Sequence, residues 1–443
     1  MSYILLPKVL NNFFFFNFKF NNKYSYQDKD SVYISKSLNL YLNYIKLNID
    51  NYNKEWDIFK KYTNPYEYIH SSVNDLKFSV CNYKPLSRSF YKMIEIINTF
   101  NLLDETNPIF SFHLAEGPGG FIQAFCHTRE NIHDKYFGMT LESSDRNIPG
   151  WKKSYQFLNE NPNVKIITGH SKNGDLFNKN NLVYIRDNYK NKCNYVTGDG
   201  GIDFSVDFNN QEYLSSRLLL AQIFYNMIIQ KVGGCFVLKI FDIFSKLTVD
   251  MLFTLSCLYE NVYLYKPNTS RIANSEKYII CKNYKGVSDK LIEYIINNFD
   301  NILNNIDSIS SLFDCDIPNY FINRIEEVNA IYGQTQIENI NFTLNIIREN
   351  NIVDISNNFI NKSRVLNKLN NLKLNNIIKS INWCKKNNLL INKHFIDYTN
   401  SNSRTNSNTT ITDNSNNNTN NTIIENSNDN GSSIDISPVY LEE

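Results

Sequence analysis

The 443-residue chain has almost no net charge, few cysteines and no long apolar segment. Its formal charge of +1 gives no global basic field of the kind that announces nucleic-acid binding, although a local basic groove stays open because binding depends on how charge is distributed. The eight cysteines are scattered, without a CxxC pair or a Cys/His cluster at metal-binding spacing. This pattern argues against structural zinc and a disulfide-stapled secreted fold, and predicts an intracellular, reducing compartment.

The apolar stretches are too short or too interrupted to span a membrane. The "FFFF" segment at 13–16 is flanked by polar residues, and no small-residue cleavage site of a signal peptide follows it. The longest apolar run, "LLLAQIFYNMII" from Leu218, is broken by Gln222 and Asn226 and is typical of a buried helix. We therefore expect no membrane association.

Composition and periodicity divide the chain into four zones. Residues 1–80 form an aromatic-rich N-terminal extension, and residues 81–287 alternate between strand-like and helix-like runs. Residues 288–397 are mostly helical in pattern. The tail, 398–443, is rich in Asn, Ser and Thr and has too little apolar surface to offset the entropy of ordering, so it is predicted to be disordered.

Glycine is also scarce, yet three of the 15 glycines lie in one stretch, "FHLAEGPGGF", at Gly117, Gly119 and Gly120. Glycine is used where the backbone needs positive φ or where another group must approach the main chain closely. A strand that ends in a glycine-rich turn and opens a helix suits a nucleotide-like ligand. The alternative is an ordinary tight turn, because short glycine motifs recur by chance.

The second zone has the pattern of strands alternating with helices. The predicted strands cover residues 108–114, 136–141, 164–169, 194–201, 233–241, 261–267 and 277–282. The predicted helices begin at residue 121 and cover 211–231 and 248–260. Such alternation indicates βαβ units and an α/β fold with a mainly parallel sheet, in which ligands bind beyond the carboxyl ends of the strands. Glu116, Asp175, Asp199 and Lys239 fall at those ends.

Four charged residues form a candidate catalytic set: Lys92, Asp199, Lys239 and Glu276. Lys239 lies in the apolar run "GCFVLKIF", where burying its charged ammonium costs free energy unless the side chain reaches a partner or a cleft. Each residue also has an ordinary interpretation: a strand-end lysine reaching solvent, a turn aspartate, or a solvated lysine on a helix with Ser87 or Ser89 as its N-cap. Taken together, two carboxylates around two lysines are suited to deprotonating a weak hydroxyl.

Six motifs occur in the order and spacing of a known family: "LSRSFYKMIEI", "HLAEGPGGFIQAF", "FGMTLES", "VTGDGGIDFS", "GGCFVLKIFDIF" and "YKPNTSRIANSEKYIICKNYKG". The chain resembles FtsJ/RrmJ-type ribose 2′-O-methyltransferases over 81–287, most of all the cap-specific mRNA members of eukaryotes and large DNA viruses. The resemblance implies a class I S-adenosylmethionine-dependent methyltransferase fold, Rossmann-like, with a seven-stranded, mostly parallel sheet and a final antiparallel strand. The N-terminal extension and the helical C-terminal region flank it.

The resemblance also implies roles for individual residues. The family's Lys-Asp-Lys-Glu tetrad falls on Lys92, Asp199, Lys239 and Glu276, with Lys239 nearest the ribose 2′-hydroxyl. The residues implied to bind S-adenosylmethionine are Glu116, Gly117, Pro118, Gly119, Gly120, Phe121, Thr140, Asp175 and Asp199. Asp175 matches the position that contacts adenine, whereas the second strand carries Thr140 in place of the acidic end of many methyltransferases. His113 replaces an aspartate of many relatives and is expected to be structural. No metal is implied.

The implied substrate is RNA, with 5′-capped mRNA methylated on its first or second transcribed nucleotide. One alternative is a ribose methyltransferase for ribosomal or transfer RNA, against which the long flanking zones argue. Another is an inactive RNA-binding subunit, against which the intact tetrad argues. The expected location is the cytoplasm, including a viral factory or virion for a viral protein, or the nucleus.

Overall fold

The computed structural model describes residues 3–9, 19–20, 32–73, 76–143, 145, 148–201, 210–356 and 359–395. The "FFFF" segment and the tail from 398 lie outside these residues. Among the described residues, no helix is both long and apolar enough to cross a membrane.

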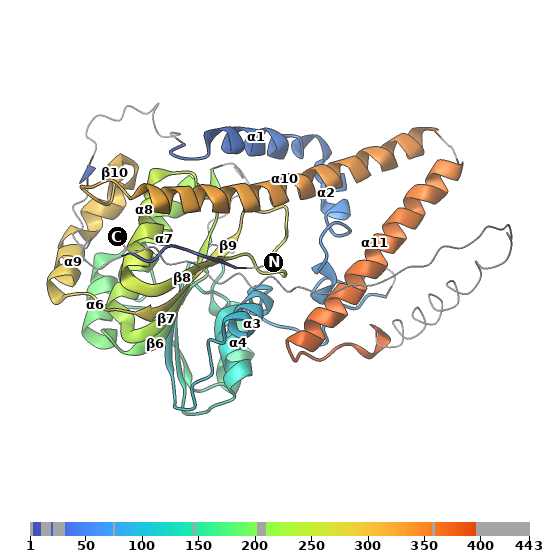
Figure 1. Cartoon of the computed structure of the whole chain (residues 1–443). Helices are drawn as coiled ribbons and strands as arrows, with labels where there is room; N and C mark the ends of the chain where they lie inside the picture. Colours follow the sequence, from blue (N-terminus) through green and yellow to red (C-terminus); the bar gives the residue numbers. More distant parts are fainter. Residues whose placement is uncertain are drawn as a thin grey trace, which may run out of the picture. The chain divides into compact units, whose positions relative to one another are not determined.

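Eight strands form the main sheet, in the order β1-β8-β9-β7-β6-β3-β4-β5 (Figure 1). The strands are β1 (Ile4–Leu5), β3 (Phe110–Leu114), β4 (Lys135–Met139), β5 (Val164–Ile166), β6 (Cys193–Gly198), β7 (Gln230–Ile240), β8 (Tyr259–Tyr265) and β9 (Lys277–Tyr284). Strands β5, β4, β3, β6 and β7 run parallel, and β9 is antiparallel to both β7 and β8. This confirms the predicted α/β fold, with seven predicted strands and a final antiparallel strand. The short β1 adds an eighth strand beside β8.

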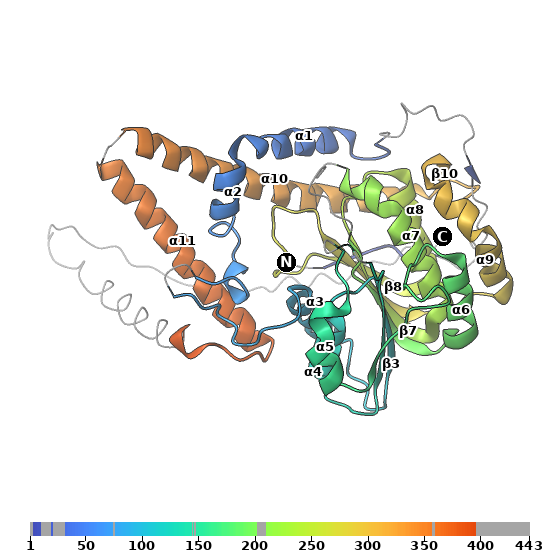
Figure 2. The ribbon, with the colours of Figure 1, turned by 180° about the vertical axis from the view of Figure 1, so that it is seen from behind.

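Helices cover both faces of the sheet. They are α3 (Ser89–Phe100), α4 (Gly120–Arg129), α5 (Tyr155–Glu160), α6 (Lys179–Tyr189), α7 (Gln211–Ile229) and α8 (Lys246–Leu258). Helices α3, α4 and α5 lie on one side, and α6, α7 and α8 lie on the other (Figures 1 and 2). The predicted cap of α3 is wrong: the helix begins at Ser89, its N-cap residue is Arg88, and no side chain caps it. The hydroxyls of Ser87 and Ser89 instead bond each other at 2.5 Å.

The flanking zones pack onto this layered core. The N-terminal helices are α1 (Lys36–Leu47) and α2 (Asn53–Phe59), with a 3₁₀ turn, η3 (Glu67–Ile69); the C-terminal helices are α9 (Asp289–Asn304), α10 (Asn319–Ser356) and α11 (Phe359–Lys386). Helix α1 lies along α10 (Figure 1), and α11 packs against η3. The remaining strands, β2 (Lys19–Phe20) and β10 (Ile309–Ser311), pair with each other. The C-terminal region is therefore helical as predicted, and its α9 and the start of α10 bury apolar side chains in the same core as the sheet. The division of the chain at residues 80, 287 and 397 stays a prediction.

One buried carboxylate connects three of these parts. Glu95 on α3 accepts hydrogen bonds from Tyr265 at the end of β8, from Asn268 and Thr269 in the loop that follows, and from Trp383 on α11. A buried charge is stable only when it is paired or fully hydrogen-bonded. Glu95 therefore fixes the β8–β9 loop relative to α3, and its bond with Trp383 connects α11 to both.

Candidate active site

The first pair of predicted site residues lies where β6 and β7 end. Gly198, the last residue of β6, is paired in parallel with Leu238 of β7, so Asp199 and Lys239 follow at neighbouring positions. The Lys239 ammonium donates to the Asp199 carbonyl oxygen at 2.8 Å and lies 3.4 Å from its Oδ1. Their side chains are 12% and 14% exposed, so the pair is largely desolvated but open to a ligand.

The second pair joins α3 to the start of β9. Lys92 Nζ lies 2.7 Å from Glu276 Oε1 and 2.9 Å from Oε2. Burial alone would raise the pKa of Glu276, but the ammonium groups of Lys92 and Lys239 lower it to about 2. Glu276 is therefore ionised at neutral pH. Its negative charge interacts with both Lys92 and Lys239, and so connects the two pairs electrostatically.

Strand register brings the two pairs to one face of the sheet. Lys239 on β7 is directly opposite Tyr278 on β9, so both side chains point the same way. Glu276 directly precedes β9, two residues before Tyr278, and the charge of Lys239 acts on it. The Tyr278 hydroxyl donates to Asp199 Oδ1 at 3.1 Å, so a residue of β9 also contacts the pair at the ends of β6 and β7. The structure thus brings together all four residues proposed as a tetrad.

Three further polar residues at this site were not predicted from the sequence: Tyr278, Ser270 and Lys266. The Ser270 hydroxyl donates to Glu276 Oε1 at 2.9 Å. The buried Lys266 ammonium donates to the backbone carbonyl of Glu276 at 2.9 Å, and burial, with Lys277 and Lys92 adding to it, lowers the pKa of Lys266 to about 7. The available signal was a lysine directly after an apolar strand, "NVYLYK", the same pattern that singled out Lys239.

The glycine-rich turn lies at the carboxyl end of β3, next to this face. Glu116 is buried; its Oε1 accepts from the backbone N–H of Phe121 at 2.5 Å, while its Oε2 has no hydrogen-bond partner. Burial and the neighbouring Asp199 raise the pKa of Glu116 well above its usual value. A buried carboxyl oxygen without a donor is costly, so this position is suited to a ligand that supplies one. Gly117 and Pro118 continue the turn, which leads into α4.

The glycines of the turn are explained in part by packing. Gly119 has a φ of +103°, which disfavours any side chain, and a Cβ there would lie 3.2 Å from the Trp151 ring. A Cβ on Gly120 would come within 2.3 Å of the hydroxyls of Ser87 and Ser89. The turn is therefore held closely between the start of α3 and the residue that begins the 3₁₀ turn η4 (Trp151–Ser154).

Thr140 and Asp175 lie side by side beyond β4 and β5. Thr140 directly follows β4 and is buried, and its carbonyl oxygen would be 2.0 Å from a Cβ on Gly174. Only a glycine allows the loop before Asp175 to touch Thr140 so closely. The Asp175 Oδ1 accepts from the backbone N–H of Phe177 at 2.9 Å, which fixes the orientation of the carboxylate. Every residue proposed to bind a cofactor thus lies at the carboxyl edge of β3, β4, β5 or β6, in the loop that follows, or, for Gly120 and Phe121, at the start of α4.

His113 is the next-to-last residue of β3 and lies inside the sheet, between β4 and β6. It is fully buried, with one ring nitrogen 2.7 Å from the Ser111 hydroxyl and the other 2.8 Å from the Thr197 hydroxyl. Burial lowers its pKa to about 3, so the ring is neutral. Its contacts are those of a structural residue. The part of the chain that the structure describes holds no group of three or more His, Cys, Asp or Glu side chains placed to bind a metal.

In a comparison with known proteins, the family model of the FtsJ-like methyltransferases matches residues 85–284. Relatives named cap-specific mRNA (nucleoside-2′-O-)-methyltransferase 1 are similar to this chain: 33% identity over 216 residues in Ailuropoda melanoleuca and 34% over 212 in Homo sapiens. These matches cover 47% and 46% of this chain but only 26% and 25% of the relatives. A cap-specific mRNA (nucleoside-2′-O-)-methyltransferase of Autographa californica nuclear polyhedrosis virus is 29% identical over 261 residues, 59% of this chain and 86% of the viral protein.

Among solved structures, human methyltransferase-like protein 13 in complex with SAH aligns with 49% of this chain and 93% of its own, at 11% identity and a TM-score of 0.31.

Proposed function

We propose that this protein, which the FtsJ-like methyltransferase model matches over residues 85–284, is an S-adenosylmethionine-dependent RNA ribose 2′-O-methyltransferase. The observation that carries the proposal is the pairing of Lys239 with Asp199 and of Lys92 with Glu276 on one face of the sheet, beside the glycine-rich turn. The proposed substrate is 5′-capped mRNA, methylated on its first or second transcribed nucleotide. The names of the vertebrate and viral relatives support this substrate, and the viral relative is matched over most of its length.

The residues at the carboxyl edge fit the proposed cofactor. The unpartnered Oε2 of Glu116 is an acceptor suited to an ammonium group such as that of the methionine moiety. The proposed cradle is the turn Glu116–Gly120 with Phe121 for the methionine end and ribose, and Thr140, Asp175 and Asp199 for the remainder. When bound, S-adenosylmethionine supplies a methyl group already activated on a sulfonium.

In the proposed mechanism the residues around Lys239 position the acceptor hydroxyl. An ammonium has three N–H donors, and Lys239 directs donors at the carbonyl and carboxylate oxygens of Asp199. The remaining position on the Lys239 nitrogen faces the 2′-hydroxyl: as an ammonium it donates an N–H to the hydroxyl oxygen and orients the group, and as a neutral amine it accepts the hydroxyl proton. Lys92 and Asp199 set the charge state of Lys239, while Glu276 holds Lys92 and the ribose. Because the leaving group is a sulfonium, positioning and electrostatics supply much of the acceleration.

The test compares one short RNA with and without a 7-methylguanosine cap. Purified protein is incubated with each RNA and labelled S-adenosylmethionine, and the product is mapped by nuclease digestion and mass spectrometry; Lys239→Ala is the inactive control. The expected result is methylation of the first or second nucleotide only when the cap is present. Equal internal methylation of the uncapped RNA would indicate the ribosomal or transfer RNA class, and no methylation of any RNA would favour an inactive RNA-binding subunit.

A further inference from the structure

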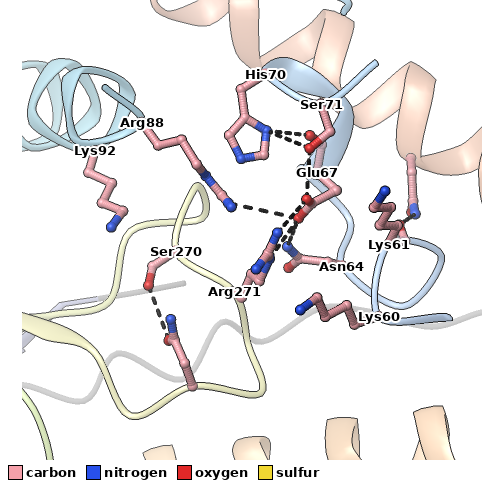
Figure 3. Close-up of polar contacts among 12 residues, drawn as sticks. Lys60, Lys61, Asn64, Glu67, His70, Ser71, Arg88, Lys92, Ser270 and Arg271 are labelled. Carbon is pink, nitrogen blue, oxygen red and sulfur yellow. Dashed lines mark hydrogen bonds and ion pairs between the residues drawn. The ribbon is translucent and has the colours of Figure 1, made fainter. Parts of the chain in front are cut away.

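A buried carboxylate from outside the matched domain lies beside the active site. Glu67 belongs to the 3₁₀ turn η3, and its side chain is fully buried. The Arg271 guanidinium donates two hydrogen bonds to it, from Nε at 3.0 Å and from an Nη at 2.7 Å. A second guanidinium, that of Arg88, approaches the same carboxylate at 3.8 Å (Figure 3). One carboxylate therefore positions two arginines that come from different parts of the chain.

The neighbours of Glu67 keep it ionised and firmly held. Asn64 donates to its Oε2 at 2.7 Å and Ser71 donates to its Oε1 at 2.8 Å. Burial alone would raise the pKa of Glu67, but its bond with Arg271 and the nearby Arg88 hold that pKa well below the usual range. The carboxylate is thus a fixed anchor with both oxygens engaged.

The two arginines carry more positive charge than the Glu67 carboxylate neutralises. Two guanidinium groups share one carboxylate, and the adjacent His70 adds no charge because burial and the nearby Arg88 lower its pKa to about 3. The side chains of Arg88 and Arg271 are 39% and 29% exposed, whereas Glu67 is not exposed at all. The Glu67 carboxylate is therefore buried, whereas both arginine side chains are partly exposed to solvent.

Both arginines are tied to the Lys92–Glu276 half of the tetrad. Arg88 precedes Lys92 by four residues, and residues at this spacing lie on the same face of a helix about one turn apart (Figure 3). Arg271 directly follows Ser270, whose hydroxyl donates to Glu276. The negative field of Glu276 reaches both guanidinium groups. A ligand that places a hydroxyl at the tetrad therefore passes next to the arginine pair.

We propose that Arg88 and Arg271 bind a backbone phosphate of the RNA adjacent to the acceptor ribose, and that Glu67 is the positioning residue that aims them. This inference rests on the proposed function, because it assigns the anion to RNA. Every ribose within an RNA chain has phosphates attached next to it, and the carbon that bears the 2′-hydroxyl neighbours the carbon that bears the 3′-phosphate. Guanidinium groups are suited to phosphate because their planar N–H groups match two of its oxygens. A chain with a net charge of +1 needs such local concentration of charge to hold RNA.

The first experiment measures RNA binding of the full chain at equilibrium. Fluorescence anisotropy of a labelled, capped, single-stranded RNA is recorded over a range of salt concentrations for the wild type, Arg88→Gln and Arg271→Gln. Arg186→Gln is the matched control, because Arg186 also bonds carboxylates, those of Asp187 and Glu293, but belongs to α6, on the face of the sheet opposite to α3. We expect each active-site variant to weaken binding about ten-fold. The slope of log Kd against log salt should fall by about 0.7 for each phosphate of the single strand that the variant no longer neutralises.

The second experiment tests the positioning role of Glu67. Glu67→Gln keeps the size of the side chain but removes the charge that orients the arginines, so the KM for RNA should rise several-fold while kcat and the affinity for S-adenosylmethionine change little. A variant that merely lost stability would instead lower kcat through the fraction of folded protein, with KM unchanged, and would melt at a lower temperature.

Arg88→Gln keeps the inference falsifiable if Glu67→Gln fails to fold, because it leaves both bonds between Arg271 and Glu67 in place. Unchanged RNA affinity and salt slope in both arginine variants would overturn the inference and point to an acidic protein segment as the ligand. The binding measurement does not depend on turnover: a wild type that methylates no RNA would refute the proposed function, while loss of RNA binding in the arginine variants would still support the phosphate contact.

Discussion

Replacing Glu276 by Gln removes the charge that pairs with Lys92 and keeps nearly the same shape. The pKa of Glu276 falls from its ordinary 4.5 to about 2 in the folded protein. At about 1.4 kcal/mol for each pKa unit, this difference makes the ionised form about 3 kcal/mol more favourable in the folded state than in the unfolded state. The side chain is 13% exposed, so solvent screens this interaction only in part. Glu276→Gln should therefore lower the free energy of unfolding at pH 7 by up to about 3 kcal/mol.

The sign of the pH dependence follows from the direction of the pKa. Because folding lowers the pKa of Glu276, its stabilising contribution is fully present above pH 4.5 and is lost as the pH falls from there towards 2. Urea unfolding of wild type and Glu276→Gln at a series of pH values between 7 and 3 should show a constant difference above pH 4.5 that narrows below it. Equal stability at pH 7, or a difference that does not narrow in acid, would refute the electrostatic account of this pair.

Three other outcomes are expected. Lys239→Ala should abolish methyl transfer and leave S-adenosylmethionine binding, measured by calorimetry, nearly intact. Double variants that combine Lys239→Ala with a change at Lys92, Asp199 or Glu276 should lose little more activity than the single variants, because residues that act as one unit are non-additive. Substantial turnover in Lys239→Ala would indicate a different base. A bulky residue at Gly119 should abolish cofactor binding, since its φ of +103° and the Trp151 ring leave no room for a side chain without moving the turn; unchanged affinity in calorimetry would contradict the assignment. Truncation after residue 397 should leave the melting temperature and methyl transfer unchanged, whereas a fall of several degrees would show that the tail packs on the rest of the chain.

The sheet was predictable because most of its core strands are short apolar runs, and several of them, such as β6 and β8, end at or just before a glycine or a charged residue. Boundaries were less predictable where composition does not distinguish helix from strand. Gln230 and Lys231 were assigned to the end of a helix, but β7 already begins at Gln230. Tyr259 was likewise assigned to a helix, yet it is the first residue of β8, where its buried hydroxyl accepts from Asn226 of α7. Such choices are made by tertiary contacts that local patterns do not contain.

The candidate site shows the same contrast. Lys239 and Asp199 stand out locally, as a lysine in an apolar strand and an aspartate between glycines. Glu67 gave no such signal, because nothing in its surrounding sequence indicates a partner 204 residues away at Arg271. Ser87 and Ser89 misled for a related reason: serine before a helix predicts a cap, but here the two hydroxyls bond each other beside Gly120. Contacts with distant parts of the chain, Arg271 for Glu67 and Gly120 for the two serines, decide the role of such residues.

The hydrogen bonds to Glu95 bear on whether the region matched by the family model, residues 85–284, is structurally independent of the rest of the chain. One of its donors, Trp383, lies about a hundred positions beyond the last residue that the family model matches, yet it meets the carboxylate that also holds the β8–β9 loop. A fragment cut at 85–284 would retain every strand from β3 to β9 and all four tetrad residues, but it would lack this indole donor. Expressing this region alone, or exchanging it with that of a related protein, would therefore keep the four proposed tetrad residues but remove the α11 donor to the carboxylate that holds the β8–β9 loop. The bond between Trp383 and Glu95 therefore makes α11 part of the structural support of α3, the helix that carries Lys92.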